Sequence, residues 1–188
     1  LEIALKALQL TEKATIALVS NAGMYASSAI ESAHYTPLYM DVNEFTMLVT
    51  LDQVEKAVAA GAEAVIVTHL FGRCIPEIVE IAAYCKKNNV WLIEDCAQAH
   101  GARLQGRHVG TFGDVGTFSF YPTKNLGGLG DGGALIVNNA TLATLAKSLK
   151  QYGWGKKYYV QHTGGVNTRL DEIQAAFLRV ALSDLDAR

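Results

Sequence analysis

The apolar positions of this chain alternate between short continuous runs and segments with helical spacing. Continuous runs, typical of buried strands, cover residues 15–20, 35–42, 64–68 and 90–94. Helical segments lie between and after them, at residues 1–9, 26–33, 51–60, 76–87, 142–149 and 171–180. This rhythm of strand and helix predicts parallel βαβ units, whose strands are apolar on both faces. We therefore expect an α/β fold.

Polar and glycine residues mark where several of these helices begin and end. Thr50 and Gln53 form a capping-box pattern before the third helix, and Gly61 suits its C-terminal cap. Thr168 with Asp171 is expected to cap the last helix in the same way.

Composition and charge narrow the class of protein. The chain has 188 residues, enough for one domain with its own core, and half of them are hydrophobic. The net charge of −2 gives no general attraction to nucleic acid or to an anionic membrane. Three cysteines without metal-like spacing indicate a reducing compartment, which we expect to be the cytoplasm, and no apolar run is long enough to cross a bilayer. Because the chain starts at Leu1 and has helical character at both ends, we interpret it as an internal fragment of a longer protein.

Three chemically useful side chains fall at or just after the carboxyl ends of predicted strands. These are Tyr25, His69 and Asp95. Parallel sheets bind ligands in the crevice outside these strand ends. The pattern therefore predicts a ligand site at this edge of the sheet.

Lys124 is the candidate for covalent chemistry. A lysine is usually a solvated surface residue, but this one follows the apolar segment 118–121, lies beside Pro122 in the turn and precedes a glycine-dense loop. A lysine held in a partly desolvated pocket can form a Schiff base with an aldehyde. Taken alone, Lys124 still favours the surface interpretation.

Asp95 changes that balance. A pyridoxal ring acts as an electron sink only while its ring nitrogen is protonated, so an anionic partner is needed there. A carboxylate at the end of a buried strand meets this need, although it could simply cap the turn that follows. Because strand side chains alternate, Glu94 should point to the opposite face, and we assign it an ordinary structural role.

The other candidates each have an ordinary alternative. Ser119 could bind a phosphate or be a plain strand serine, and Tyr25 could stack on a planar ring or simply pack. His69 and His100 could be acid–base groups or satisfied histidines near the sheet edge. Histidines and cysteines lack zinc-site spacing, so we expect no metal. The glycine run at 127–133 has neither P-loop nor dinucleotide signatures and is interpreted as a mobile hairpin that lets the backbone approach a cofactor.

Three motifs together resemble a known family. Residues 94–102 read Glu-Asp-Cys-Ala-Gln-Ala-His-Gly-Ala, residues 113–126 read Gly-Asp-Val-Gly-Thr-Phe-Ser-Phe-Tyr-Pro-Thr-Lys-Asn-Leu, and residues 130–133 read Gly-Asp-Gly-Gly. They resemble the DegT/DnrJ/EryC1/StrS family of pyridoxal-phosphate-dependent sugar aminotransferases, and residues 166–176 resemble its later signature. The resemblance covers essentially the whole chain. It implies the large domain of fold type I, a three-layer α/β/α arrangement with a mostly parallel sheet.

The resemblance also implies roles for individual residues. Lys124 would form the Schiff base with pyridoxal 5'-phosphate and then shuttle the proton, while Asp95 would pair with the ring nitrogen. Gln98 would contact the cofactor's phenolic oxygen. Ser119 would bind the phosphate, and Tyr25 would stack on the ring.

Assembly and reaction follow from the same resemblance. Asn167 matches an asparagine that reaches the cofactor phosphate of the neighbouring subunit, which implies a homodimer with shared active sites. An amino-acid donor, usually glutamate, would load the cofactor. A nucleotide-linked (dTDP- or UDP-) ketosugar would then accept the amino group, for amino-sugar, O-antigen lipopolysaccharide or antibiotic sugar biosynthesis. Lys124 argues against the dehydratase branch, which has histidine there, and the loop at 152–165 is a candidate sugar contact.

The departures from the family pattern matter. Residues 1–188 would be a partial PLP-binding large domain, without the start of that domain and without the C-terminal small domain. We therefore expect the isolated chain to bind cofactor poorly and to turn over little. Two alternatives stay open: a catalytically impaired PLP-binding or regulatory homologue, and a purely structural α/β domain.

Overall fold

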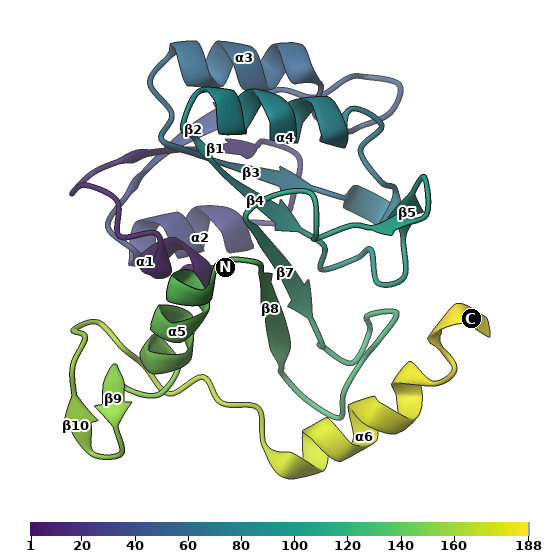
Figure 1. The fold of residues 1–188 in the computed structure, drawn as a ribbon. Helices are drawn as coiled ribbons and strands as arrows, with labels where there is room; N and C mark the ends of the chain where they lie inside the picture. Colours follow the sequence, from purple (N-terminus) through teal and green to yellow (C-terminus); the bar gives the residue numbers. More distant parts are fainter. Residues whose placement is uncertain (188) are drawn as a thin grey trace.

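The apolar runs form a six-stranded central sheet in the computed structural model, which describes residues 1–187 (Figure 1). The strands are β1 (Thr15–Val19), β2 (Thr36–Met40), β3 (Ala64–Thr68), β4 (Trp91–Asp95), β7 (Val115–Ser119) and β8 (Gly133–Val137). Their order is β2-β1-β3-β4-β7-β8, with every neighbouring pair parallel except the antiparallel pair β7 and β8. The predicted mostly parallel sheet is confirmed.

Helices cover both faces of this sheet, so the three-layer arrangement is confirmed as well (Figure 1). The α-helices are α1 (Glu2–Ala7), α2 (Tyr25–Ser32), α3 (Leu51–Ala59), α4 (Ile78–Lys87), α5 (Ala140–Leu149) and α6 (Glu172–Leu182). Helices α3 and α4 pack on one face, and α1, α2 and α5 pack on the other. The shorter elements are η1 (Leu70–Gly72), η2 (Leu185–Ala187), β5 (Arg103–Leu104), β6 (Arg107–His108), β9 (Trp154–Lys156) and β10 (Tyr159–Val160). Among the described residues, no helix combines the length and the apolar sequence that a bilayer span needs.

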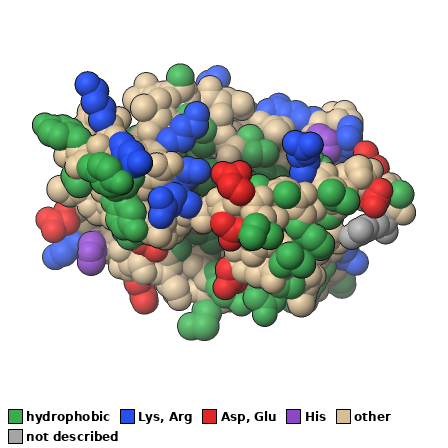
Figure 2. All heavy atoms as spheres, turned by 90° about the horizontal axis from the view of Figure 1, so that it is seen from below, with side chains coloured by type: hydrophobic (Ala, Val, Ile, Leu, Met, Phe, Trp, Pro, Cys, Tyr) green, Lys and Arg blue, Asp and Glu red, His purple; other side chains and the backbone are tan. Residues whose placement is uncertain are grey.

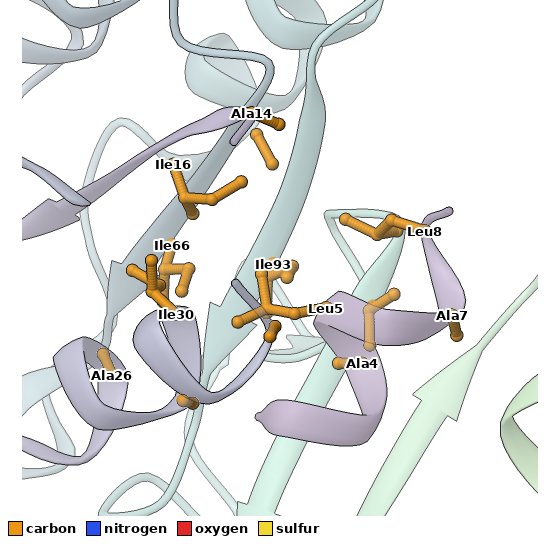
Figure 3. Packing of buried hydrophobic residues seen from close by; sticks show 14 of the residues in the cluster. Ala4, Leu5, Ala7, Leu8, Ala14, Ile16, Ala26, Ile30, Ile66 and Ile93 are labelled. Carbon is orange, nitrogen blue, oxygen red and sulfur yellow. The ribbon is translucent and has the colours of Figure 1, made fainter. Parts of the chain in front are cut away.

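Alternating side chains of the parallel strands supply two separate cores. In β3, Ile66 packs toward α1, α2 and α5, whereas Val65 and Val67 pack toward α3 and α4. Figure 3 shows the first core, where Ile66 and Ile93 from neighbouring strands meet Ile30 of α2. This burial on both faces explains why the strand sequences are continuously apolar.

The order of the strands places a crevice at one edge of the sheet. The chain passes from β1 through α2 to β2, and then through α3 to β3 on the other side of β1. Because the chain reverses direction between β1 and β3, the loops at the carboxyl ends of these two strands lead to opposite faces of the sheet. The loops that follow β1, β3 and β4 all leave from this edge.

One predicted helix cap is wrong and another is confirmed only in part. Thr50 occupies the N-cap position of α3 but its side chain makes no cap hydrogen bond. The Leu51 N–H donates instead to the carboxylate of Glu77, at 3.2 Å. At α6 the cap is Asp171 alone, which accepts from the Gln174 N–H at 2.8 Å, so Thr168 takes no part. At α3 a distant carboxylate replaces the local cap, whereas at α6 the cap is local but starts three residues later than Thr168.

Other local expectations have mixed outcomes. Gly61 follows α3 with φ +96°, which confirms it as the residue that ends the helix. The segment 152–165 is not a plain loop, because it contains the antiparallel pair β9 and β10. The apolar residues Ile173, Phe177 and Val180, which recur at helical spacing in the segment 171–180, lie on the exposed side of α6. Figure 2 shows hydrophobic side chains gathered on the face seen from below.

Ile66 provides a test of the core. Its side chain is fully buried, so Ile66→Ala should lower the free energy of unfolding by about 2–5 kcal/mol, through lost burial and the cavity left behind. Urea unfolding measures this change. The matched control is Ile173→Ala on the exposed side of α6, which should change stability by less than about 0.5 kcal/mol. Equal effects of the two substitutions would contradict the burial described for β3.

Candidate functional site

A cavity of about 680 Å³ opens at the carboxyl ends of β4 and β7. Its lining includes Tyr25, Asp95, Ser119 and Lys124. The structure thus brings together four of the six residues singled out from the sequence. They come from the start of α2, the end of β4, the end of β7 and the turn that follows β7.

Asp95 is placed by the alternation of β4. It is the last residue of the strand and pairs with Thr68 on one side and Thr117 on the other. Its Oδ1 accepts a hydrogen bond from the Ala97 N–H at 3.0 Å, so the capping role considered for it is also real. Among residues 1–187, no donor reaches its second oxygen, Oδ2. That oxygen is available to a ligand in the cavity.

Burial dominates the electrostatics of Asp95. It raises the pKa of this carboxyl group above the ordinary value, while the Ala97 N–H, the amino group of Leu1 and the positive charge of Lys124 act in the opposite direction. The net shift is upward. The site therefore holds a carboxylate whose charge is incompletely compensated, and a cationic ligand group would stabilise its ionised form.

A tightly folded turn carries Lys124. The Lys124 N–H donates to the Tyr121 carbonyl at 2.9 Å, and the Ser119 Oγ accepts from the Tyr121 N–H at 3.3 Å. Gly127 closes the turn so tightly that a Cβ there would lie 2.5 Å from the Pro122 carbonyl oxygen. The backbone itself therefore holds Ser119 and Lys124 at the same cavity.

The glycine run packs against α6. Gln174 Oε1 accepts from the Leu129 N–H at 2.8 Å, and a Cβ at Gly128 would lie 2.8 Å from the same oxygen. A Cβ at Gly130 would lie 2.9 Å from Gln174 Nε2. The run thus makes room for this amide, and it belongs to a hairpin formed by antiparallel β7 and β8.

Two predicted site residues lie outside the cavity lining. The Gln98 Oε1 accepts from the Phe71 N–H at 2.9 Å, beside the cavity residue Ala97. Asn167 is exposed, and its Oδ1 accepts from Arg169 Nε at 2.8 Å. Asn167 therefore does not line the cavity of its own chain.

Glu94 is the polar residue whose importance the sequence did not reveal. It points to the opposite face from Asp95, as expected, and is completely buried. Its Oε2 accepts from the Gly110 N–H at 2.8 Å, and its Oε1 accepts from the N–H groups of Phe112 and Gly113, each at 2.6 Å. His69 Nε2 lies 2.9 Å from Oε2. Four donors therefore converge on this one carboxylate.

The tautomer of His69 follows from its two partners. The Ile75 N–H donates to His69 Nδ1 at 3.1 Å, so Nδ1 carries no proton and Nε2–H donates to Glu94. Both ring nitrogens are used, and the ring is fully buried. His69 is therefore a satisfied histidine, not an acid–base group of the cavity. Burial alone would raise the pKa of Glu94, but the hydrogen bonds from His69, Gly113 and Gly110 lower it below its ordinary value.

His69, Glu94 and Cys96 place possible metal-binding atoms within 4.8 Å of one another. The donor set does not fit a metal, because His69 and the Glu94 oxygens already take part in the hydrogen bonds described above. Burial also raises the pKa of the Cys96 thiol, which keeps it protonated.

His100 lies beside the turn of Lys124. Its ring centroid is 5.5 Å from that of Phe118 and 6.2 Å from that of Phe120. Burial lowers its pKa, the Ser119 backbone raises it and the Lys124 charge lowers it, for a net downward shift. The Ser119 backbone lies near the ring, but neither ring nitrogen reaches a partner among the described residues with hydrogen-bond geometry.

Comparison with known proteins identifies the family of this chain. A model of the DegT/DnrJ/EryC1/StrS aminotransferase family matches residues 1–188. The chain belongs to this family. The predicted family is confirmed, and members of the DegT/DnrJ/EryC1/StrS family depend on pyridoxal phosphate.

Individual relatives of the DegT/DnrJ/EryC1/StrS family match nearly the whole chain. The chain is 40% identical over 186 residues to the dTDP-3-amino-3,4,6-trideoxy-alpha-D-glucose transaminase of Micromonospora megalomicea subsp. nigra, covering 99% of this chain and 50% of the relative. It is 41% identical over 160 residues to the pleiotropic regulatory protein of Geobacillus stearothermophilus, covering 85% and 42% of the two chains. The S. venezuelae DesV structure in complex with a ketimine intermediate matches with a TM-score of 0.93 at 35% identity, over 99% of this chain and 50% of that one. The chain spans about half the length of the curated relatives it matches.

Glu94 gives a pH-dependent prediction. Its folded-state pKa lies below its unfolded value of about 4.3, so its contribution to stability is present above that value and is lost as pH falls through the folded pKa. Glu94→Gln should lower the free energy of unfolding by about 2–4 kcal/mol at neutral pH, because an amide NH₂ would face existing donors. The difference from wild type should narrow below about pH 4.

Urea unfolding from neutral to acidic pH measures this difference. Glu80→Gln, on the exposed side of α4, is the control and should change stability by less than about 0.5 kcal/mol. A Glu94→Gln penalty that stays constant down to acidic pH would contradict the assignment of a buried charged carboxylate.

Proposed function

We propose that this chain forms the cofactor site of a pyridoxal-phosphate-dependent aminotransferase that acts on a nucleotide-linked ketosugar. The observation that carries the proposal is the shared cavity of Asp95 and Lys124, a half-buried carboxylate and a primary amine at the carboxyl edge of a parallel sheet. Membership of the DegT/DnrJ/EryC1/StrS family supports it.

The residues present fit the cofactor. When bound, pyridoxal phosphate supplies an aldehyde and an electron sink. Asp95 would hold the proton on the ring nitrogen, and a pyridinium there would stabilise the carboxylate against the burial that raises its pKa. The open Oδ2 of Asp95 is available for this bond. Tyr25 would cover one face of the ring from the start of α2.

Lys124 would act at two stages. Its Nζ would first bind the aldehyde carbon. As a free amine, the same group would take up and return the proton that nitrogen transfer requires. The turn that carries it also presents the Ser119 hydroxyl, which would bind the phosphate. One rigid turn would thus set the distance between the phosphate anchor and the reacting carbon.

Substrates and assembly belong to the same proposal. The acceptor is a dTDP- or UDP-linked ketosugar and the donor is an amino acid, glutamate in the first instance; the name of the Micromonospora relative supports the sugar nucleotide. The protein works in the cytoplasm as a homodimer, in amino-sugar, O-antigen or antibiotic sugar biosynthesis. The exposed position of Asn167, outside its own cavity, supports a role at the cofactor phosphate of the partner subunit.

A second function is a regulatory homologue that binds the cofactor without transferring nitrogen. It is favoured by the 41% identity to a protein named as a pleiotropic regulator. Both functions need Lys124 and Asp95 to bind the cofactor, so only turnover separates them. A panel of keto-sugar nucleotides offered with glutamate should yield amino sugars if the enzyme proposal holds, and none if the regulatory one does.

Borohydride trapping tests the cofactor site. The full-length protein, purified with pyridoxal phosphate, should show a visible absorbance band, and reduction followed by peptide mass spectrometry should find the cofactor on Lys124. Lys124→Ala should abolish the adduct. Lys56→Ala is the control, because Lys56 is an exposed lysine of α3 that pairs with Asp52, and it should leave the adduct intact. An adduct on another lysine, or none in wild type, would refute the proposal.

Asp95→Asn separates the roles of the two cavity residues. An amide cannot supply the negative charge that keeps the ring nitrogen protonated, so the variant should still form the Lys124 adduct but transfer nitrogen at least about 100-fold more slowly. Single-turnover conversion of the cofactor by glutamate measures this rate. Wild-type rates in Asp95→Asn would show that the carboxylate is not the partner of the ring nitrogen.

A further inference from the structure

The turn that follows β3 is more constrained than a connecting loop requires. It comprises His69 to Gly72 and leads into the next segment at Ile75. At its base, the His69 N–H donates to the Asp95 carbonyl at 3.0 Å, and the His69 ring is held by Glu94 and by the Ile75 N–H. The base of the turn is therefore tied to the end of β4, where Asp95 lies.

Phe71 adopts a backbone conformation that phenylalanine rarely takes. Its φ is +58° and its ψ is 26°, in the left-handed region that favours glycine. Its ring is 70% exposed and buries little in return. What the conformation does achieve is a direction for the Phe71 N–H, which donates to Gln98 Oε1 at 2.9 Å. A conformation of this kind persists where the surrounding structure fixes it, and here the contact with Gln98 does so.

The hydrogen bond fixes which end of the Gln98 amide faces the turn. The oxygen must face the Phe71 N–H, because the NH₂ group there would set two donors against each other. Gly72 follows with φ +76°, and a Cβ there would lie 3.2 Å from the Gln98 carbonyl oxygen. The backbone on both sides of the contact is thus held close, and the Gln98 Nε2 protons are directed away from the turn.

We propose that the His69–Gly72 turn is a positioning element, in which the left-handed Phe71 orients Gln98 so that it presents only donors to the anionic phenolic oxygen of the cofactor. Phe71 acts through Gln98 and touches no reacting atom. The inference rests on the proposed cofactor site and adds to it the element that sets the direction of the Gln98 donor.

A pair of substitutions at Phe71 isolates the backbone from the ring. Phe71→Gly and Phe71→Val both remove the ring, but glycine enters the left-handed region freely while β-branched valine resists it. Donation from Gln98 would stabilise the phenolic anion of the bound cofactor. This effect is largest when the nitrogen that joins Lys124 to the cofactor has lost its proton. Loss of the donor should therefore raise the pH midpoint of the absorbance change of the bound cofactor.

The expected result is an ordered series of midpoints. Protein carrying pyridoxal phosphate should keep its wild-type midpoint in Phe71→Gly, and shift upward by about one pH unit in Phe71→Val and in Gln98→Met. Equal shifts in the glycine and valine variants would overturn the proposal, since the ring would then be the cause. An unchanged midpoint in Gln98→Met would overturn it as well, because no donor would have been lost.

A second measurement needs no cofactor. Amide hydrogen exchange in the unloaded protein should be faster for the Phe71 N–H in Gln98→Met than in wild type, by on the order of tenfold. The Ile75 N–H, which donates to His69 Nδ1, is the internal control and should be unchanged. Unaltered exchange at Phe71 would overturn the positioning role. Failure of wild type to form the Lys124 adduct would refute the proposed function separately, and exchange would still decide whether Gln98 is held by the turn.

Discussion

The buried charge of Glu94 is the interaction on which the site depends. A carboxylate removed from water costs several kcal/mol unless donors surround it, and here His69 and three backbone N–H groups do so. These donors come from the turn after β3 and from the segment at 110–113 that leads into β7. The Glu94 carboxylate therefore connects three parts of the chain by hydrogen bonds: the turn after β3, strand β4 and the segment before β7.

The pKa values of two adjacent carboxyl groups in β4 shift in opposite directions. Glu94 and Asp95 face opposite sides of the sheet, and the protein supplies a full set of donors only to Glu94. Its pKa is lowered, whereas burial raises the pKa of Asp95, whose protein partners are too few to reverse the shift. The alternation of a strand thus separates a carboxylate that holds the fold together from one that is left for a cationic ligand.

Sequence periodicity predicted the parts of this structure that are local. The strands at 64–68 and 90–94 were expected within one residue of β3 and β4, and the carboxyl-edge rule placed Tyr25 and Asp95 at one site. The partners of Glu94 could not be found in this way, because they lie 16 to 25 residues from it and follow no repeat. The cap at Thr50 failed for the same reason: a carboxylate 26 residues away from Leu51 takes the N–H.

The glycine run shows how a distant helix controls the turn of Lys124. Gln174 fits between Gly128 and Gly130 and accepts from Leu129, so the loop can close only where α6 places this amide. Yet Leu178 is the one buried residue of α6 within the described chain. Few of the helix's own contacts hold it in place, and the loop contact is among them. Because the β7–β8 hairpin connects the glycine run directly to the turn that carries Lys124, the order of that turn is linked to the position of α6.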